Sequence, residues 1–207
     1  MANLGNMSIA DLRLGATQVK AAYLGGQRIW GGGSPTPPGP SVEPLCFTLD
    51  GTGDSNTISL NKTGSPDPIS IEYSTDGSAW SDYTWDGNAG LVIPLASNGD
   101  KVYFRAKTEN PTISNSSGNY YWFSTPGKAS SIRVSGNIQT LLKADGSRTD
   151  APAYCYYYLL NRPDFKSAPE LPATTLADHC YAYMFNNCYY LTAAPELPAT
   201  TLAPYCY

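Results

Sequence analysis

The feature that most constrains this chain is a long internal repeat near its C-terminus. The ten residues Ala168–Ala177 (Ala-Pro-Glu-Leu-Pro-Ala-Thr-Thr-Leu-Ala) recur without change at Ala194–Ala203, 26 residues later. The pair Cys180-Tyr181 recurs at the same offset as Cys206-Tyr207, and an earlier, diverged copy contains Cys155-Tyr156. Repeats of roughly 20 to 45 residues bury their apolar side chains only by stacking on their neighbours. The sequence therefore predicts stacked repeat units over residues 131–207.

Apolar and sulfur-containing residues recur in the repeat unit and are its expected core. The five cysteines of the chain form no C-x-x-C pair, and its single His leaves no His/Cys cluster with zinc spacing. Because cysteine is often buried as a small apolar residue, we expect free, buried thiols, no metal and no cofactor. The expected repeat core consists of Leu171, Leu176, Cys180, Met184, Phe185, Cys188 and Leu191.

Tyrosine is concentrated in the same region, where Ala151–Tyr207 holds ten of the sixteen tyrosines. A tyrosine ring is rigid and amphipathic, which suits a recognition surface, but rings repeating in register also suit structural stacking. We leave both interpretations open, and favour a structural role for Tyr156 and Tyr181 because they recur in register. The residues of the possible ligand face are Tyr157, Tyr158, Tyr183, Tyr189 and Tyr190.

Residues 45–130 show short alternating apolar and polar runs separated by turn residues. Lys101–Lys107 alternates clearly and should direct Val102, Phe104 and Ala106 inward. Asp76-Gly77 predicts the turn of a hairpin. Seven short strands predict an immunoglobulin- or fibronectin-like β-sandwich. The expected strands are 45–49, 57–61, 69–74, 81–85, 91–95, 101–107 and 120–124.

The N-terminal part has a different composition. Residues 31–44 contain nine Gly or Pro out of fourteen, which indicates a linker. Residues 1–30 precede it, and Ala16–Trp30 reads as a β-hairpin with Gly25-Gly26 at its turn. Such a short segment cannot bury a core of its own, so we expect it to dock on another surface. The residues expected to make that contact are Leu12, Leu14, Val19, Tyr23, Leu24, Ile29 and Trp30.

Composition disfavours several classes of function. Charged residues make up 14% of the chain and the net charge is −4, so the strongly basic face of a nucleic-acid-binding protein is not expected. No stretch approaches the roughly 18 apolar residues of a membrane span. The His179 position holds Tyr in the other copies, and Glu170 and Glu196 are equivalent repeat positions rather than an acid/base pair. We therefore expect no enzymatic activity, no nucleic acid and no membrane insertion.

Three segments resemble known protein families. Leu12–Trp30 is similar to a short β-element near the virion-bound end of phage structural proteins. The repeat, with Leu-Pro-Ala-Thr-Thr-Leu-Ala177, Cys180-Tyr181, Met184-Phe185, Cys188 and Leu191, resembles the BspA-like leucine-rich repeats of surface proteins from Bacteroidota and their phages, crAss-like phages among them. Ser74–Trp80 is similar to the Asp-box hairpin of some glycan-active proteins, but is one residue short, and we favour a plain hairpin.

These resemblances imply a non-enzymatic protein of adhesion or surface display. The expected order is a virion anchor (1–30), a linker (31–44), an immunoglobulin-like sandwich (45–130) and the start of BspA-like repeats (131–207) that continue beyond Tyr207. The first interpretation is a head- or tail-attached fibre or decoration protein on the virion exterior, trimeric by analogy, that contacts capsid or tail proteins and a host surface or glycan. Met1–Leu14 lacks the apolar run of a signal peptide, which favours this interpretation. The alternative is an adhesin on the bacterial cell surface.

Overall fold

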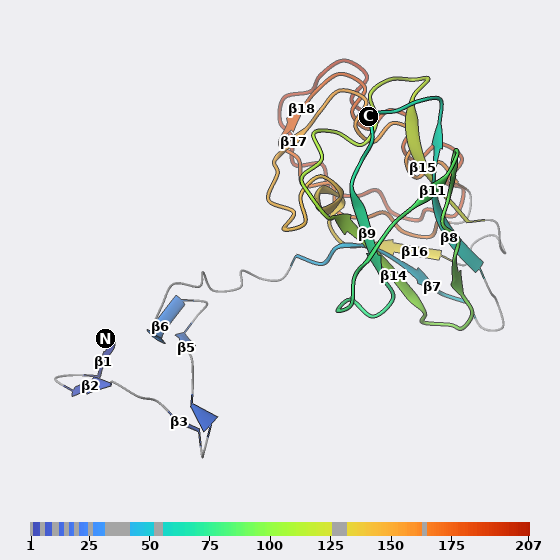
Figure 1. The fold of residues 1–207 in the computed structure, drawn as a ribbon. Helices are drawn as coiled ribbons and strands as arrows, with labels where there is room; N and C mark the ends of the chain where they lie inside the picture. Colours follow the sequence, from blue (N-terminus) through green and yellow to red (C-terminus); the bar gives the residue numbers. More distant parts are fainter. Residues whose placement is uncertain are drawn as a thin grey trace. The chain divides into compact units, whose positions relative to one another are not determined.

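The computed structural model describes residues 2–4, 7–9, 13–14, 17–18, 21–24, 27–31, 42–51, 56–125, 132–162 and 165–207 (Figure 1). The chain divides into two compact units, Met1–Val42 and Glu43–Tyr207. The described part is mainly β, with several antiparallel sheets and one short 3-10 helix, η1 (Ile138–Leu141). This confirms the expected β class. None of the described residues belongs to a helix long and apolar enough to cross a membrane.

The described residues of the first unit form three small antiparallel pairs, β1–β2, β3–β4 and β5–β6. Leu24 pairs with Gln27 on either side of Gly25 and Gly26, as the hairpin prediction requires, but the predicted first strand is divided between β4 and β5. Of the predicted anchor residues, Leu12 and Val19 lie outside the described residues, as do residues 32–41 of the linker. The six strands are β1 (Ala2–Leu4), β2 (Met7–Ile9), β3 (Arg13–Leu14), β4 (Thr17–Gln18), β5 (Ala21–Leu24) and β6 (Gln27–Gly31).

The second unit contains a five-stranded sheet, ordered β10-β9-β14-β7-β16, and a three-stranded sheet, ordered β13-β8-β15. Every pairing in these sheets is antiparallel. Their strands are β7 (Leu45–Leu49), β8 (Asn56–Thr63), β9 (Ile71–Ser74), β10 (Ser81–Asp82), β13 (Ile93–Leu95), β14 (Lys101–Ala106), β15 (Tyr120–Ser124) and β16 (Ile132–Ser135). Two further short strands, β11 (Trp85–Asp86) and β12 (Ala89–Gly90), pair with each other.

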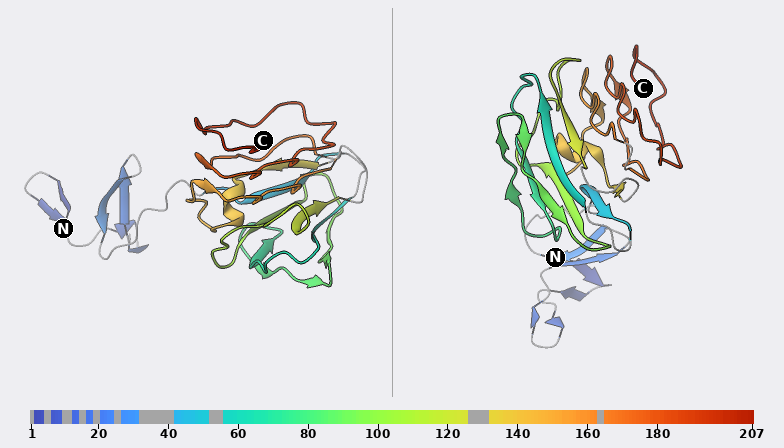
Figure 2. Two further views of the ribbon diagram at one scale, coloured as in Figure 1. Left: turned by 90° about the horizontal axis from the view of Figure 1, so that it is seen from above. Right: turned by 90° about the vertical axis from the view of Figure 1, so that its right-hand side faces the viewer.

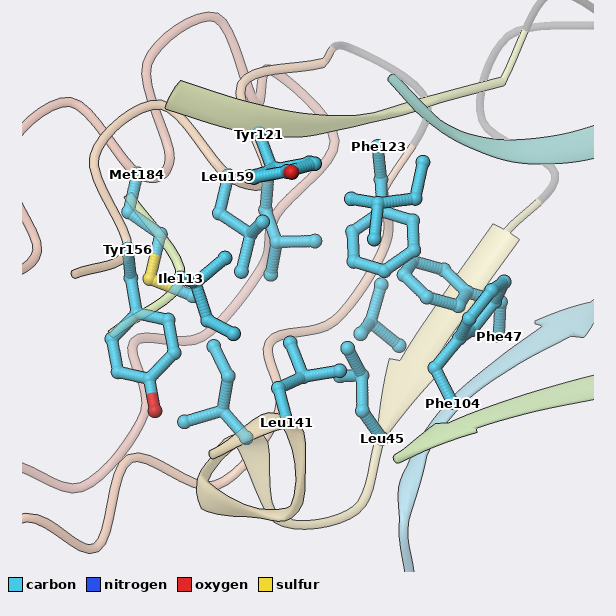
Figure 3. Packing of buried hydrophobic residues seen from close by; sticks show 14 of the residues in the cluster. Leu45, Phe47, Phe104, Ile113, Tyr121, Phe123, Leu141, Tyr156, Leu159 and Met184 are labelled. Atoms are coloured by element: carbon cyan, nitrogen blue, oxygen red, sulfur yellow. The ribbon is translucent and has the colours of Figure 1, made fainter. Parts of the chain in front are cut away.

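Alternation along the strands places the apolar side chains between the two sheets. On β14 the predicted inward residues Val102, Phe104 and Ala106 are all buried, while their neighbours are less so. Phe123 of β15 lies 4.5 Å from Phe47 of the opposite sheet and 5.0 Å from Phe104, measured between ring centroids (Figure 3). Aromatic rings at such spacing contribute beyond their buried area. These contacts hold the two sheets face to face.

The predicted strand 81–85 is interrupted at Tyr83. This ring is buried, and its hydroxyl accepts a hydrogen bond from the Leu60 amide and donates one to the Leu91 carbonyl, both at 2.6 Å. The Tyr83 amide still donates to the Ile71 carbonyl at 2.9 Å, next to the β10–β9 pairs, whereas Trp85 and Asp86 pair with Gly90 and Ala89. The segment therefore divides into β10 and β11 where it passes from one partner strand to another. Gly90 allows the close approach, because a Cβ there would lie 2.0 Å from the Leu60 carbonyl oxygen.

β16 was not predicted as a strand, and it joins the sheets to the repeats. On one side it pairs with β7, and on the other Ile132 forms a parallel bridge with Phe165. A second parallel bridge joins Asn137 to Glu170. The expected boundary between residues 130 and 131 is therefore not a boundary between compact units, because Glu43–Tyr207 forms one unit. Covering the β16 edge also satisfies backbone groups that would otherwise remain open.

Successive copies of the repeat lie in layers beside the sheets (Figure 2). The first layer contacts β15 directly, since the Phe123 amide donates to the Leu159 carbonyl at 2.9 Å. The short strand β17 (Asp150–Ala151) pairs in parallel with β18 (Thr175–Leu176). Tyr156 and Met184 belong to the same buried cluster as Phe47 and Phe104 (Figure 3). The sheets and the first repeat copies thus share one core.

Candidate ligand-binding hollow

Rings at equivalent repeat positions stack on one another from layer to layer. The ring centroid of Tyr156 lies 5.3 Å from that of Tyr181, and the Tyr181 centroid lies 5.8 Å from that of Tyr207. The ring planes are nearly parallel in both pairs. In a second column His179 lies between Tyr154 and Tyr205, at 4.7 Å from each. The buried Tyr156 and Tyr181 have the structural role that their repetition predicted.

Hydrogen bonds between layers hold this register. The amides of Tyr154, Tyr156 and Tyr158 donate to carbonyls of the next copy at Asp178, Cys180 and Ala182. Tyr154 and Tyr158 have φ of 55° and 57°, and His179 and Tyr183 have φ of 56°. Residues other than Gly seldom adopt this left-handed backbone conformation, because their Cβ atom then lies too close to the backbone. The layers therefore impose a backbone conformation that the isolated sequence disfavours.

A hollow of about 430 Å³ lies where the first two repeat copies meet β15. We call it the aromatic hollow, and it is lined by Tyr120, Trp122, Tyr158, Asn161, Arg162, Asn187 and Tyr189. Tyr120 and Trp122 alternate with the buried Tyr121 and Phe123 on β15, so they face away from the core. The Tyr120 ring lies 5.6 Å from that of Tyr158, with 30° between their planes. The hollow thus combines aromatic rings with amide and guanidinium groups, which is typical of ligand sites.

Arg162 is the charged residue among those lining the hollow. Its guanidinium carbon lies 4.6 Å from the centre of the Trp122 ring, a cation–π contact. Its Nε is buried, and no hydrogen-bond partner for it exists among the described residues. The other arginines with described side chains each have a carboxylate partner: Arg105 with Glu72, Arg133 with Asp50, and Arg148 with Asp150. No such partner of Arg162 is found in the described ranges.

Polar groups at the rim of the hollow are linked to one another. The Asn187 Nδ2 donates to Asn161 Oδ1 at 3.1 Å, and the Tyr189 hydroxyl donates to Asn187 Oδ1 at 3.0 Å. Asn187 has φ of 64°, a conformation that Asn tolerates better than most residues. These bonds orient both amides, and each amide keeps further donors or acceptors for a ligand.

The predicted ligand face is distributed unevenly. Tyr158 and Tyr189 line the hollow, Tyr183 and Tyr190 are exposed outside it, and Tyr157 is buried at 8% exposure. Sequence reasoning missed Tyr120, Trp122, Asn161, Arg162 and Asn187 as lining residues. The outward alternation of β15 marks Tyr120 and Trp122 as a face, but only the contact between β15 and the repeats brings that face to Arg162.

The predicted repeat core divides into two groups. Leu171, Cys180 and Met184 are buried, whereas Leu176, Phe185, Cys188 and Leu191 are half-buried. Burial raises the pKa of the Cys155 thiol to about 11 and that of Cys180 to about 12. These groups are therefore protonated at neutral pH and are weak nucleophiles.

Two other hollows lie in the second unit. One of about 480 Å³ is lined by Asp76, Asp100, Lys101 and other residues. There Asp76 accepts from the Ser78 and Ala79 amides, which lowers its pKa, and Asp100 accepts from Ala96 and Ser97. These bonds support the plain hairpin interpretation of Ser74–Trp80. A third, of about 390 Å³, lies between the Pro-Glu-Leu-Pro segments, where Glu170 and Glu196 are exposed.

The described residues contain no group of three or more His, Cys, Asp or Glu side chains placed to hold a metal ion. Comparison with models of known protein families, with curated protein sequences and with solved structures finds no match to this chain in any of the three.

Proposed function

We propose that this chain is a non-enzymatic adhesion protein displayed on the exterior of a phage particle. In this proposal residues 1–30 attach to a capsid or tail protein, and the Gly/Pro-rich residues 31–44 act as a spacer. The unit Glu43–Tyr207 then contacts a host surface or its glycans. The assembly is a homotrimer, which light scattering on the purified protein would detect as three times the 22.2 kDa chain mass.

The observation that carries the binding role is the aromatic hollow. It brings four aromatic side chains, two amides and a guanidinium without a carboxylate partner in the described ranges to one place on the surface. Tyr183, Tyr189 and Tyr190 extend an exposed aromatic surface from the repeats. Rigid aromatic side chains beside adaptable amides are typical of recognition surfaces.

Resemblance supports the more detailed assignment. We assign the two facing sheets to an immunoglobulin-like sandwich and the stacked copies to BspA-like leucine-rich repeats. The parallel β17–β18 pair, the ring columns and the layer-to-layer hydrogen bonds are what stacked repeats produce. The resemblance of Leu12–Trp30 to virion-bound elements supports the anchor.

Immunogold labelling of purified particles from the genome that encodes this chain tests the proposal. An antibody against Glu43–Tyr207 should label the exterior of intact particles, and a chain lacking residues 1–30 should remain unattached. Label on the envelope of uninfected cells would instead support the alternative, a bacterial surface adhesin, which the repeat resemblance also favours. Unchanged particle labelling after the deletion would contradict the anchor.

A further inference from the structure

We propose that the aromatic hollow binds a sugar residue that carries a carboxylate, such as a sialic acid or a uronic acid. This inference rests on the proposed adhesion function and names the chemical class of its ligand. It is carried by three properties of the hollow: a guanidinium without a carboxylate partner in the described ranges, aromatic rings on two structural elements, and amides held in fixed orientation.

The guanidinium selects the charge and shape of the ligand. Arg162 lies over Trp122, which restricts its position before any ligand arrives. An arginine presents planar pairs of N–H donors that match the two oxygens of a carboxylate. In the described part of the chain no acidic residue takes that place, whereas Arg105, which also lies over a tryptophan, Trp80, is neutralised by Glu72. In this proposal the ligand supplies to Arg162 the anion that Glu72 supplies to Arg105.

The rings select a sugar over a simple anion. A pyranose ring exposes C–H groups on its faces, and these pack against the negative face of an aromatic ring. Tyr120 and Trp122 come from β15, and Tyr158 and Tyr189 come from the repeat copies, so rings from separate elements border the hollow. Arg162 covers one face of Trp122 and Tyr158 stacks on Tyr183, so Tyr189, which is 78% exposed, offers the most open ring to a sugar. A volume of about 430 Å³ accommodates one or two sugar residues rather than an inorganic ion.

The amides account for the hydroxyl groups of the ligand. Asn161 and Asn187 are joined by one hydrogen bond, and Tyr189 fixes Asn187 from the other side. A side-chain amide can donate and accept at once, which matches neighbouring sugar hydroxyls. Because these groups are oriented in advance, little conformational entropy is lost on binding.

The test is a calorimetric titration of the full 207-residue chain with matched sugars. Sialyllactose is compared with lactose, from which it differs by an added sialic acid. Glucuronic acid is compared with glucose, from which it differs by a carboxylate in place of a hydroxymethyl group. The acidic sugar of each pair should bind at least tenfold more tightly than the neutral one. Raising the salt concentration should lower the affinity for the acidic sugar, because part of the attraction is between charges.

Variants then locate the site. Arg162→Gln should reduce the affinity for sialyllactose at least tenfold, and Arg162→Lys should restore it only in part, because an ammonium cannot form the two-pronged contact. Arg105→Gln is the matched control, since it also removes an arginine from a tryptophan face and should leave binding unchanged. Circular dichroism spectra that match the parent chain show that each variant is folded.

Three results would overturn the inference: equal affinity for the acidic and neutral sugars, an unchanged affinity of Arg162→Gln, or no binding of any of the four sugars. Tighter binding of a sulfated galactose than of sialyllactose would overturn the carboxylate assignment. Adhesion itself is measured separately, as adsorption of labelled particles to host cells. If the particles adsorb to host cells but none of the sugars binds the chain, the proposed ligand class is wrong and the proposed adhesion function stands.

Discussion

At the residue scale, the unusual feature is that aromatic residues occupy left-handed backbone positions. Tyr154, His179 and Tyr205 have φ between 51° and 56°, although no glycine stands at these places. Left-handed geometry costs about 1–2 kcal/mol for a residue with a Cβ. The stacked rings and the hydrogen bonds between layers offset this cost. The side chain is therefore selected for stacking and not for its turn conformation.

Paired substitutions at His179 separate the two effects. His179→Ala and His179→Gly both remove the ring, but only Ala keeps the strained Cβ. The Gly variant should be the more stable by about 1 kcal/mol in urea denaturation, the reverse of the usual order. The control is Tyr190, which has no left-handed φ, and where the Ala variant should be at least as stable as the Gly variant. If the Ala and Gly variants have the same order of stability at residues 179 and 190, the backbone of His179 is not strained.

At the element scale, identical sequences have different surroundings. Leu171 and Leu197 occupy the same place in the two ten-residue copies, yet Leu171 is 3% exposed and Leu197 is 46% exposed. The copy Ala168–Ala177 contacts β17 and the start of η1 and shares a hollow with Ala194–Ala203, whereas in the described structure Ala194–Ala203 is covered on one side only. Burial in a repeat protein is thus a property of the neighbouring layers and not of the repeat sequence.

Truncation of these two leucines tests that statement. Leu171→Ala should lower the free energy of unfolding by about 2–5 kcal/mol, because it leaves a cavity in the core. Leu197→Ala, in an identical sequence, should cost less than about 1 kcal/mol. Chemical denaturation of both variants provides the comparison. Equal losses would show that the second copy is as buried as the first.

Acid should weaken the connection between the repeats and the sheets. The Arg148 guanidinium beside Asp150 lowers the pKa of that carboxyl in β17, and Arg148 also donates to the Asn110 carbonyl. A carboxyl whose pKa is lower in the folded chain stabilises it above the unfolded pKa of about 3.9, and this contribution is lost as the pH falls through the folded value. Urea denaturation between pH 6 and pH 2 should show falling stability. The decline should be shallower for Asp150→Asn, and an equal decline would exclude Asp150 as a source.

Much of the fold follows from local sequence. The bounds of β7 and β15 match the predicted 45–49 and 120–124, since each is a short run of mostly apolar residues between polar or turn residues. β16 could not be predicted from local sequence, because its four residues form a strand by pairing with β7 and with Phe165, which are distant in sequence. The predicted strand 81–85 likewise divides because its two halves pair with different strands, β9 and β12.

At the scale of the whole unit, the binding site is a product of the shared core. Tyr158 and Tyr189 could be predicted from the tyrosine-rich repeats, but Trp122 and Arg162 belong to segments that sequence analysis assigned to different domains. They meet because the first repeat copy packs on β15, through the Phe123–Leu159 hydrogen bond and the cluster of Figure 3. No local pattern encodes that contact.

The sheets and the first repeat copy should form one folding unit that fixes the hollow. Native-state hydrogen exchange followed by mass spectrometry measures whether they open together. Peptides covering β15 and residues 155–160 should exchange through openings of equal free energy, and both should lose protection equally in Leu159→Ala. If the peptide from residues 155–160 exchanges through openings several kcal/mol lower in free energy than those of β15, the repeats unfold as a separate unit and the shared core does not fix the hollow.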